Sequence, residues 1–122
     1  MDTIYQELIL DLNRNPLNKQ KLSDFDVCVK ESNPLCGDQA ELFIKYDNNG
    51  KVENVGFQGN GCAVSQAALS VLTEQIKGKT KDEILALTPN DLQSLLGLQN
   101  LNPTRLRCLS LGLKALQKNP KS

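Results

Sequence analysis

The hydrophobic periodicity of this chain changes at Gly61, and this change limits the possible folds more than any other feature. Before Gly61, apolar and polar residues alternate over residues 40–46, which is typical of a half-buried β-strand. After it, apolar residues recur every three or four positions, as in an amphipathic helix: Val64, Ala67, Ala68, Val71 and Leu72. Strands that are followed by helices, rather than alternating with them, predict an α+β fold.

The segments before Gly61 predict a helix, a short strand and a β-hairpin. The helix covers residues 3–14, and Pro16 ends it because proline disfavours a helical residue before it. The short strand is "FDVCVK", residues 25–30. The hairpin covers residues 39–58, with the turn at "DNNG", residues 47–50, whose side chains tolerate positive φ.

Four helices are predicted after the hairpin. The first continues to Gly78, and Thr80 with Glu83 forms the capping box of the second. The third is a short helix that opens with a capping box of Thr88 and Asp91, with Pro89 at its first position. The fourth and last helix begins near Pro103 with Asn102 as its N-cap, and it carries a leucine stripe at residues 106, 109, 113 and 116. We therefore expect a small antiparallel sheet covered by helices.

Composition limits the class of protein. We expect one domain over residues 1–122, and this length suffices for an aliphatic core without disulfides. The 14 basic residues equal the 14 acidic ones, which disfavours a nucleic-acid or membrane-surface role. The start, "MDTIYQELIL", does not read as a signal peptide, and no apolar stretch approaches a membrane span. We expect a cytoplasmic protein, whose cysteines serve metal binding or reactivity.

Three cysteines lie near the ends of predicted elements. Cys36 lies in a turn before the hairpin, Cys62 opens a helix, and Cys108 lies in the first turns of the last helix. A helix N-terminus favours the thiolate of Cys62, and Arg105 with Arg107 favours that of Cys108. We expect Gly59 and Gly61 to permit tight backbone beside Cys62, and Gly112 to leave open space beside Cys108.

The chain has no histidine, so a metal site must use other ligands. Three thiolates and one carboxylate form a four-ligand set that Zn²⁺ accepts, and Asp38, two residues after Cys36, supplies the carboxylate. Each residue also has a plainer interpretation. A cytosolic cysteine is most often a small buried apolar residue, which is our prediction for Cys28. In the same plainer interpretation, Asp38 is a turn carboxylate, and Arg105 and Arg107 belong to a solvated helix face.

At these motifs the sequence resembles a known family. "NPLCGD", "GNGCAVSQAALSVLTEQIKGK" and "RLRCLSLGLKAL" are similar to the three cysteine motifs of the NifU N-terminal-like iron–sulfur assembly proteins of the IscU and SufU types. The first helix with its Asn-Pro exit resembles the SufU type. The resemblance implies a three-stranded antiparallel sheet and a metal site of Cys36, Asp38, Cys62 and Cys108.

The resemblance also implies an activity. IscU types build a [2Fe–2S] cluster with sulfur from a cysteine desulfurase. SufU types bind zinc and accept sulfur from the desulfurase SufS. We expect Cys108 to be the persulfide acceptor, supported by Arg105. A downstream iron–sulfur carrier or apo-protein would then be the recipient. Such a role is at most a sulfurtransferase half-reaction.

The chain departs from both types. Arg107 stands where IscU types have a histidine before the third cysteine, which favours SufU. The stretch between Cys62 and Cys108 lacks the SufU insert, and Leu12 replaces a SufU histidine, which disfavours a SufU-like desulfurase contact through the first helix. "LNPTR", residues 101–105, replaces the IscU motif for an Hsp70-type chaperone, which disfavours that partner. Two competing hypotheses remain: a structural zinc-binding paralogue without sulfur chemistry, and, ranked last, a redox thiol protein, which the absence of CxxC disfavours.

Overall fold

The structure is a computed structural model that describes residues 3–33, 37–97 and 103–118. Its elements run in the order α1 (Thr3–Arg14), β1 (Val27–Asn33), β2 (Asp38–Tyr46), β3 (Val52–Gln58), α2 (Ala63–Ile76), α3 (Lys81–Leu85), α4 (Pro89–Leu96) and α5 (Pro103–Lys118). One helix and three strands thus precede four helices, which confirms the predicted α+β class. No helix within the described ranges is long and apolar enough to cross a membrane.

The three strands form one antiparallel sheet in the order β1-β2-β3. The predicted hairpin is confirmed, with a register shift at Lys45 and Tyr46 that interrupts the alternation near the turn. The first strand was predicted too early: β1 extends beyond residue 30 because it pairs with β2 up to Asn33 opposite Asp38. The longer pairing places Asp38 at the very start of β2, next to the end of β1.

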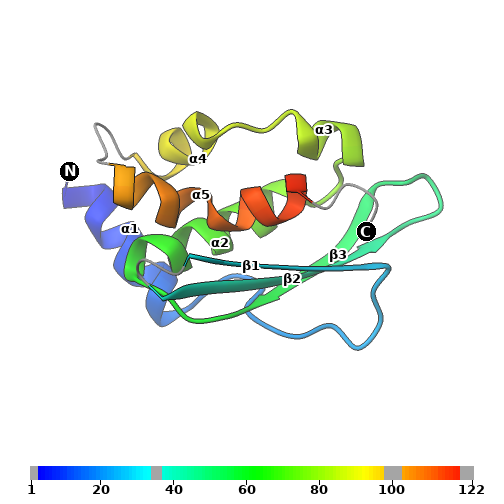
Figure 1. Cartoon of the computed structure of the whole chain (residues 1–122), viewed down its shortest axis with the longest axis horizontal. Helices are drawn as coiled ribbons and strands as arrows, with labels where there is room; N and C mark the ends of the chain where they lie inside the picture. The colour runs from blue at the N-terminus through cyan, green and yellow to red at the C-terminus, as the bar shows by residue number, and fades with distance from the viewer. Residues whose placement is uncertain (1–2, 34–36, 98–102, 119–122) are drawn as a thin grey trace.

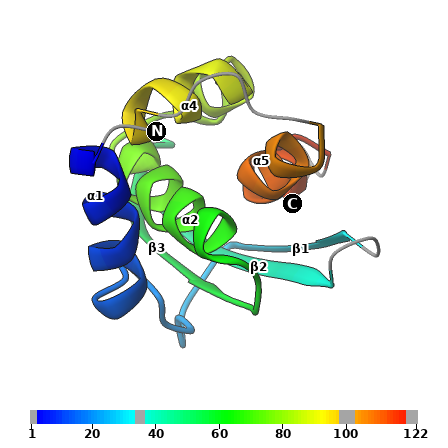
Figure 2. The ribbon, with the colours of Figure 1, turned by 90° about the vertical axis from the view of Figure 1, so that its left-hand side faces the viewer.

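Helices α2 and α5 lie side by side on one face of the sheet, and α4 lies over them on the side away from the sheet (Figures 1 and 2). Helix α1 lies beside α2. The core fills the space between these layers with aliphatic side chains and one phenylalanine, including Leu42, Val55, Phe57, Leu69, Leu96 and Leu113. The leucine stripe predicted for the last helix is confirmed at Leu109, Leu113 and Leu116.

The connection between α1 and β1 covers part of the opposite face of the sheet. Phe43 points to this face and is only 1% exposed, because Phe25 packs edge-on against it with ring centroids 5.2 Å apart. Gly56, which pairs with Phe43, permits the crossing: a Cβ there would lie 2.3 Å from the backbone oxygen of Gln20. Alternation in β2 alone would have left Phe43 in solvent.

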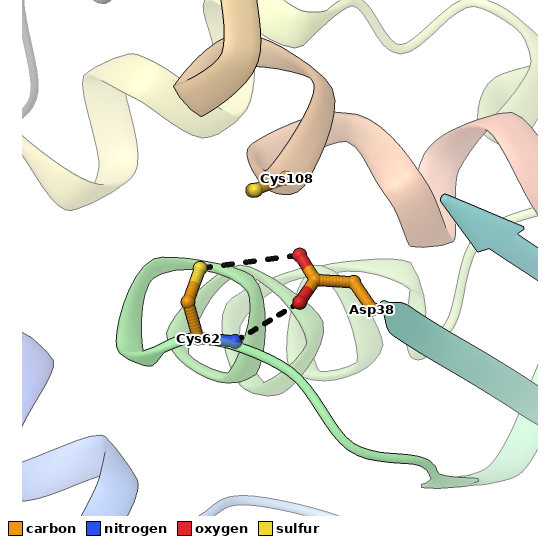
Figure 3. Close-up of side chains that lie close together, drawn as sticks. All are labelled: Asp38, Cys62 and Cys108. Carbon is orange, nitrogen blue, oxygen red and sulfur yellow. Dashed lines mark hydrogen bonds between the residues drawn. The ribbon is translucent and has the colours of Figure 1, made fainter. Parts of the chain in front are cut away.

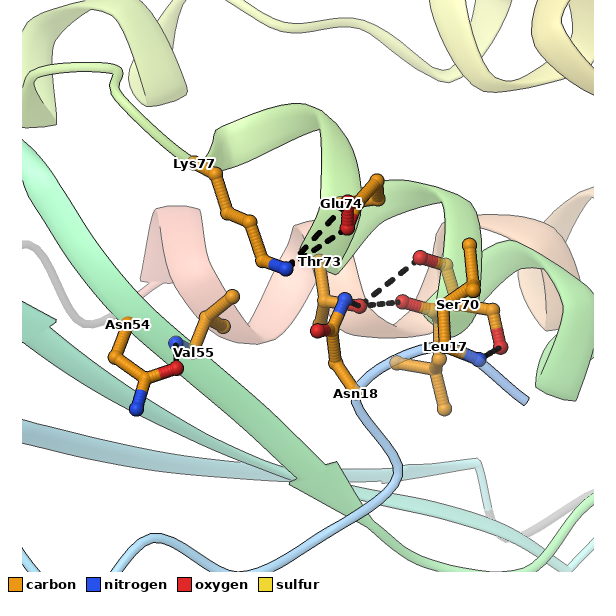
Figure 4. A network of polar contacts seen from close by, with 9 residues as sticks. Leu17, Asn18, Asn54, Val55, Ser70, Thr73, Glu74 and Lys77 are labelled. Carbon is orange, nitrogen blue, oxygen red and sulfur yellow. Dashed lines mark hydrogen bonds and ion pairs between the residues drawn. The ribbon is translucent and has the colours of Figure 1, made fainter.

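The same connection fastens α2 to the edge of the sheet (Figure 4). The backbone N–H of Leu17 donates to Ser70 Oγ at 3.2 Å, and Asn18 Nδ2 donates to Thr73 Oγ1 at 3.1 Å. The carbonyl of Asn18 accepts from the N–H of Phe57 in β3 at 2.9 Å, and Asn18 itself has a φ of 62°. These bonds fix α2 against β3 and thereby fix where the first turn of α2 lies.

Both predicted capping boxes are present. The side chains of Thr80 and Thr88 accept from the backbone N–H of Glu83 and Asp91, and the carboxylates of Glu83 and Asp91 accept from the backbone N–H of the two threonines.

The prediction of open space beside Gly112 is wrong, because a Cβ there would lie 2.5 Å from Leu69 Cδ2. The glycine instead allows α5 to approach α2 closely. With this approach, the start of α2 at Cys62 lies near Cys108 in the second turn of α5.

Candidate metal centre

Three predicted ligands from three separate segments converge at one point. Asp38 begins β2, Cys62 precedes α2 and Cys108 lies in the second turn of α5. The ligand atoms of the three side chains all lie within 4.8 Å of one another. Figure 3 shows the side chains pointing into the same small space between the start of β2 and the two helices.

Asp38 is buried, with 2% of its surface exposed. One carboxylate oxygen, Oδ1, accepts a hydrogen bond from the backbone N–H of Cys62 at 3.1 Å. The other, Oδ2, lies 3.9 Å from Cys62 Sγ. A buried charge requires a partner, because moving a carboxylate out of water costs several kcal/mol even after relaxation. The first oxygen is therefore anchored to the protein, while the second faces the sulfur atoms.

Two glycines shape the backbone beside this carboxylate. A Cβ at Gly59 would lie 2.0 Å from the backbone oxygen of Gln39, and φ at Gly59 is +138°. A Cβ at Gly61 would lie 2.2 Å from Ser65 Oγ and 2.9 Å from Asp38 Oδ1. The predicted need for tight backbone here is confirmed, and its cause is the close approach of the residue 59–61 segment to the start of β2.

Cys62 is the N-cap residue of α2, with φ −72° and ψ 170°, and its side chain makes no capping hydrogen bond. The residue is half-buried, and its sulfur is turned toward Asp38. The prediction that Cys62 opens a helix is therefore confirmed. Its thiol donates instead to Asp38 Oδ2 at 3.9 Å, an interaction that a metal bound to both groups would replace.

Two polar residues that the sequence analysis did not single out hold the start of α2. Ser65 is 1% exposed, and its hydroxyl donates to the carbonyl of Cys62 at 3.0 Å. Asn13 Nδ2, from the last turn of α1, donates to the carbonyl of Ala63 at 3.0 Å. The contact of Ser65 could have been predicted, because a serine three residues after a helix N-cap often hydrogen-bonds to the backbone of that residue. The contact of Asn13 spans 50 residues and had no local signal.

Cys108 is 4% exposed and lies between α5 and the other two ligands. Arg107, beside it in sequence, is exposed. Cys36 lies outside the described residues, as does the side chain of Arg105, whose backbone belongs to the first turn of α5. The roles predicted for Cys36 and Arg105 therefore stay predictions.

The prediction that Cys28 is a buried apolar residue is wrong. It is half-buried on the face of the sheet opposite α2, and its thiol donates to Glu41 Oε2 at 3.5 Å. Burial, followed by the hydrogen bond and negative charge of Glu41, raises the pKa of this thiol. Glu41 also pairs with Lys30 at 3.3 Å beside a groove of about 500 Å³. Cys28 is therefore separate from the Asp38 cluster.

The donor set of the cluster suits a borderline-soft divalent metal. Two thiols and a carboxylate supply three of the four ligands of a tetrahedral Zn²⁺ site, and thiolates equally bind the irons of iron–sulfur clusters. The residues present fit such a group. One further ligand would complete the site.

Comparisons with known proteins agree with this arrangement. The family model of the NifU-like N terminal domain matches residues 4–121. The zinc-dependent sulfurtransferase SufU of Bacillus subtilis is 34% identical, covering 97% of this chain and 90% of that protein. The iron–sulfur cluster assembly scaffold protein IscU 1 of Archaeoglobus fulgidus is 35% identical over 94% of this chain and 73% of its own length.

A solved structure has the same fold. The crystal structure of FiSufU from Fervidobacterium islandicum AW-1, described as an iron–sulfur cluster assembly scaffold protein for the SUF system, superposes with a TM-score of 0.79. It is 30% identical and covers 97% of both chains. The alignment with the Bacillus protein extends over 135 positions, more than the 122 residues here, so that relative carries residues without a counterpart. This chain belongs to the family of the NifU-like N terminal domain.

Proposed function

We propose that this protein serves iron–sulfur cluster assembly. In this role Cys36, Asp38, Cys62 and Cys108 hold a metal, and the cysteines accept sulfane sulfur from a cysteine desulfurase. The observation that carries the proposal is the convergence of Asp38, Cys62 and Cys108 within 4.8 Å from three separate segments. The matches to SufU and IscU proteins along nearly the whole chain support it.

A bound Zn²⁺ would hold the thiols in their deprotonated form, which is the form that reacts with a persulfide. The protein's own contribution is to bring the ligands together. The 61–65 turn holds Cys62, the start of β2 carries Asp38, and the close approach of α5 at Gly112 brings in Cys108. We propose Cys108 as the thiol that holds the persulfide, with Arg105 supporting it.

The partner would be a cysteine desulfurase of the SufS or IscS kind, in the cytoplasm, and the recipient an iron–sulfur carrier or an apo-protein. The even balance of charge and the absence of a membrane-spanning helix in the described part of the chain fit a protein partner. The segment on which the Hsp70-type chaperone prediction depends, residues 101–105, lies outside the residues whose side chains are described, so that prediction stays a prediction.

The first test is the metal and acid-labile sulfide content of protein purified without oxygen. About one zinc per chain without sulfide would support the zinc-dependent acceptor role. Iron and sulfide in equal amounts would support the scaffold role. Protein that binds neither zinc nor iron, although it is folded, would contradict the proposal.

The second test separates sulfur chemistry from a purely structural zinc site. Cys108→Ser should abolish the stimulation of a cysteine desulfurase, while the circular dichroism spectrum stays unchanged. Cys28→Ser is the matched control, because Cys28 lies on the opposite face of the sheet, and it should leave stimulation intact. Unchanged stimulation by the Cys108→Ser variant would favour the structural paralogue.

A further inference from the structure

We infer that Gln66 is a positioning residue of the metal centre, whose side-chain amide donates an N–H hydrogen bond to the sulfur of Cys62 when that sulfur is bound to a metal ion. This inference rests on the proposed function and adds a residue that supports the ligands without being one. Its basis is an amide that is buried and unpaired. Gln66 is 6% exposed, and neither Nε2 nor Oε1 has a hydrogen-bond partner among the described residues.

The unpaired amide is an exception within α2. The other buried polar side chains of this helix are those of Ser65, Ser70 and Thr73, and each of them takes part in at least one hydrogen bond. Burying an amide without hydrogen bonds destabilises a folded chain, and an apolar residue of similar size would avoid that cost. We therefore expect the amide to gain its partner in the metal-bound protein.

Gln66 lies one helical turn after Cys62. Its backbone N–H donates to the carbonyl of Cys62 at 3.0 Å. Residues four apart on a helix are neighbours on its surface, with about 5–6 Å between their Cβ atoms, and helical side chains tilt toward the N-terminus. Ser65 in the same turn already reaches back, since its hydroxyl donates to the Cys62 carbonyl. The longer side chain of Gln66 can therefore span the distance to Cys62 Sγ.

Metal binding changes what Cys62 Sγ can accept. In the structure the thiol donates to Asp38 Oδ2 at 3.9 Å, and a protonated thiol is only a weak acceptor. A metal-bound sulfur is a thiolate, and an anionic acceptor forms stronger hydrogen bonds. The amide of Gln66 offers two N–H donors without adding charge. A bond from Nε2 would stabilise the thiolate and hold it in place toward the ion.

Zinc affinity and stability of the full-length protein test this inference together. Gln66→Met replaces the amide with an unbranched apolar side chain of similar size. The metal-free variant should melt at or above the wild-type temperature, because the unpaired amide is gone. Its zinc affinity, measured by competition with a chromophoric chelator, should fall by about 10–100-fold, the range typical of a group that hydrogen-bonds to a metal ligand. A residue that only fills the core would not lower affinity while leaving stability intact.

Two further variants control this measurement. Gln66→Leu is a second apolar replacement with a different shape, and it should behave as Gln66→Met does. Gln75→Met makes the same change at an exposed position of α2 and should alter neither quantity. If both apolar Gln66 variants melted well below wild type without metal, the amide would already have a partner in the metal-free protein, and the inference would be overturned.

Cobalt(II) gives a spectroscopic readout of the hydrogen bond itself. Loss of an N–H donor raises the energy of the sulfur lone pair, so the thiolate-to-cobalt charge-transfer band of both Gln66 variants should move to longer wavelength. The visible d–d bands should keep their positions, because the ligands stay the same. A charge-transfer band at the wild-type wavelength in both variants would overturn the inference.

Failure of this inference is distinguishable from failure of the proposed function. If wild type and both Gln66 variants bind zinc with equal affinity, the role of Gln66 is wrong and the proposed function stands. If folded wild-type protein binds neither zinc nor cobalt, the proposed function fails and the inference fails with it.

Discussion

Asp38 divides its two carboxylate oxygens between two tasks: Oδ1 accepts the N–H of Cys62 at 3.1 Å, and Oδ2 lies 3.9 Å from the sulfur of the same residue. The first contact joins the start of β2 to the start of α2, and the second brings an oxygen ligand to the cysteine. The same side chain therefore serves the fold and the site, and substitutions can separate these roles.

Asp38→Asn should weaken zinc binding while preserving the fold. The amide oxygen still accepts from Cys62, but the anionic ligand is lost. Loss of a residue that only hydrogen-bonds to a metal ligand typically lowers metal affinity by roughly 10–100-fold, so loss of a ligand itself should lower zinc affinity by more than that. The zinc-free variant should be at least as stable as wild type. A buried carboxylate costs several kcal/mol, against about 1.5–3 kcal/mol gained from one hydrogen bond to a charged group. Competition with a chromophoric chelator and thermal unfolding give the two quantities.

Asp11→Asn is the matched control, because Asp11 lies on an exposed part of α1 and its carboxylate forms an exposed ion pair with Arg14 at 3.6 Å. It should change neither zinc affinity nor stability measurably. If Asp38→Asn bound zinc as tightly as this control, Asp38 would not be a ligand.

Gly61→Ala should disturb the site without changing any ligand. The new Cβ would meet Ser65 Oγ at 2.2 Å and Asp38 Oδ1 at 2.9 Å. Both are buried, so we expect a loss of about 1–3 kcal/mol in the free energy of unfolding together with weaker zinc binding. Gly61→Ala combined with Ser65→Ala removes the shorter contact and should recover part of both losses.

Gly50→Ala controls for the effect of adding a methyl group to a glycine. Gly50 has a φ of +77° with nothing within 4 Å of the added atom. It should cost about 1–2 kcal/mol through backbone strain alone and leave zinc affinity unchanged. Equal effects of the two substitutions on zinc affinity would contradict the role assigned to Gly61.

Cys28 should react slowly at neutral pH, because burial and Glu41 raise the pKa of its thiol. Glu41→Gln keeps an acceptor but removes the negative charge that helps to raise the pKa of the Cys28 thiol, so alkylation of Cys28 at pH 7 should quicken. Lys30→Met should slow it, since Lys30 lowers this pKa. Alkylation rates between pH 7 and pH 9.5, followed by peptide mass spectrometry, check both directions.

The capping box of α3 should contribute measurably to stability. Thr80→Ala removes the acceptor for the Glu83 N–H and should cost about 1 kcal/mol, or roughly 4 °C in the melting temperature. Thr80→Ser retains the hydroxyl and should cost less than half as much. Urea unfolding of the two variants measures the difference, and equal losses would show that the hydroxyl does not act as a cap.

The pH dependence of this box follows from Glu83. Hydrogen bonds from the Thr80 backbone N–H and then its side chain hold the Glu83 pKa below its ordinary value of 4.5. A carboxylate whose pKa is lower in the folded state stabilises the protein above the unfolded pKa, and this stabilisation is lost as pH falls through the folded pKa. Glu83→Gln should therefore flatten the fall in stability below pH 4.5. An unchanged slope would contradict this assignment.

The sequence by itself determined the class of fold and the kind of residues in the site. Apolar alternation over residues 40–46, helical spacing after Gly61 and the two Thr-x-x-acid caps depend on local geometry, so each could be predicted without the rest of the molecule. Cys62 at a helix start was also readable, because glycines mark the ends of elements, whereas Asp38 was expected in the turn just before the hairpin and instead begins β2.

The tertiary structure decided which of these residues meet and how accessible each one is. Cys108 came to Cys62 because Gly112 lets α5 pack closely on Leu69 of α2, a contact between residues 43 positions apart that no local pattern encodes. The crossing segment that covers Phe43 and the Glu41 partner of Cys28 likewise depend on non-local pairing. Burial is a property of the assembled layers, so only the structure could distinguish the accessible Cys62 from the covered Cys108.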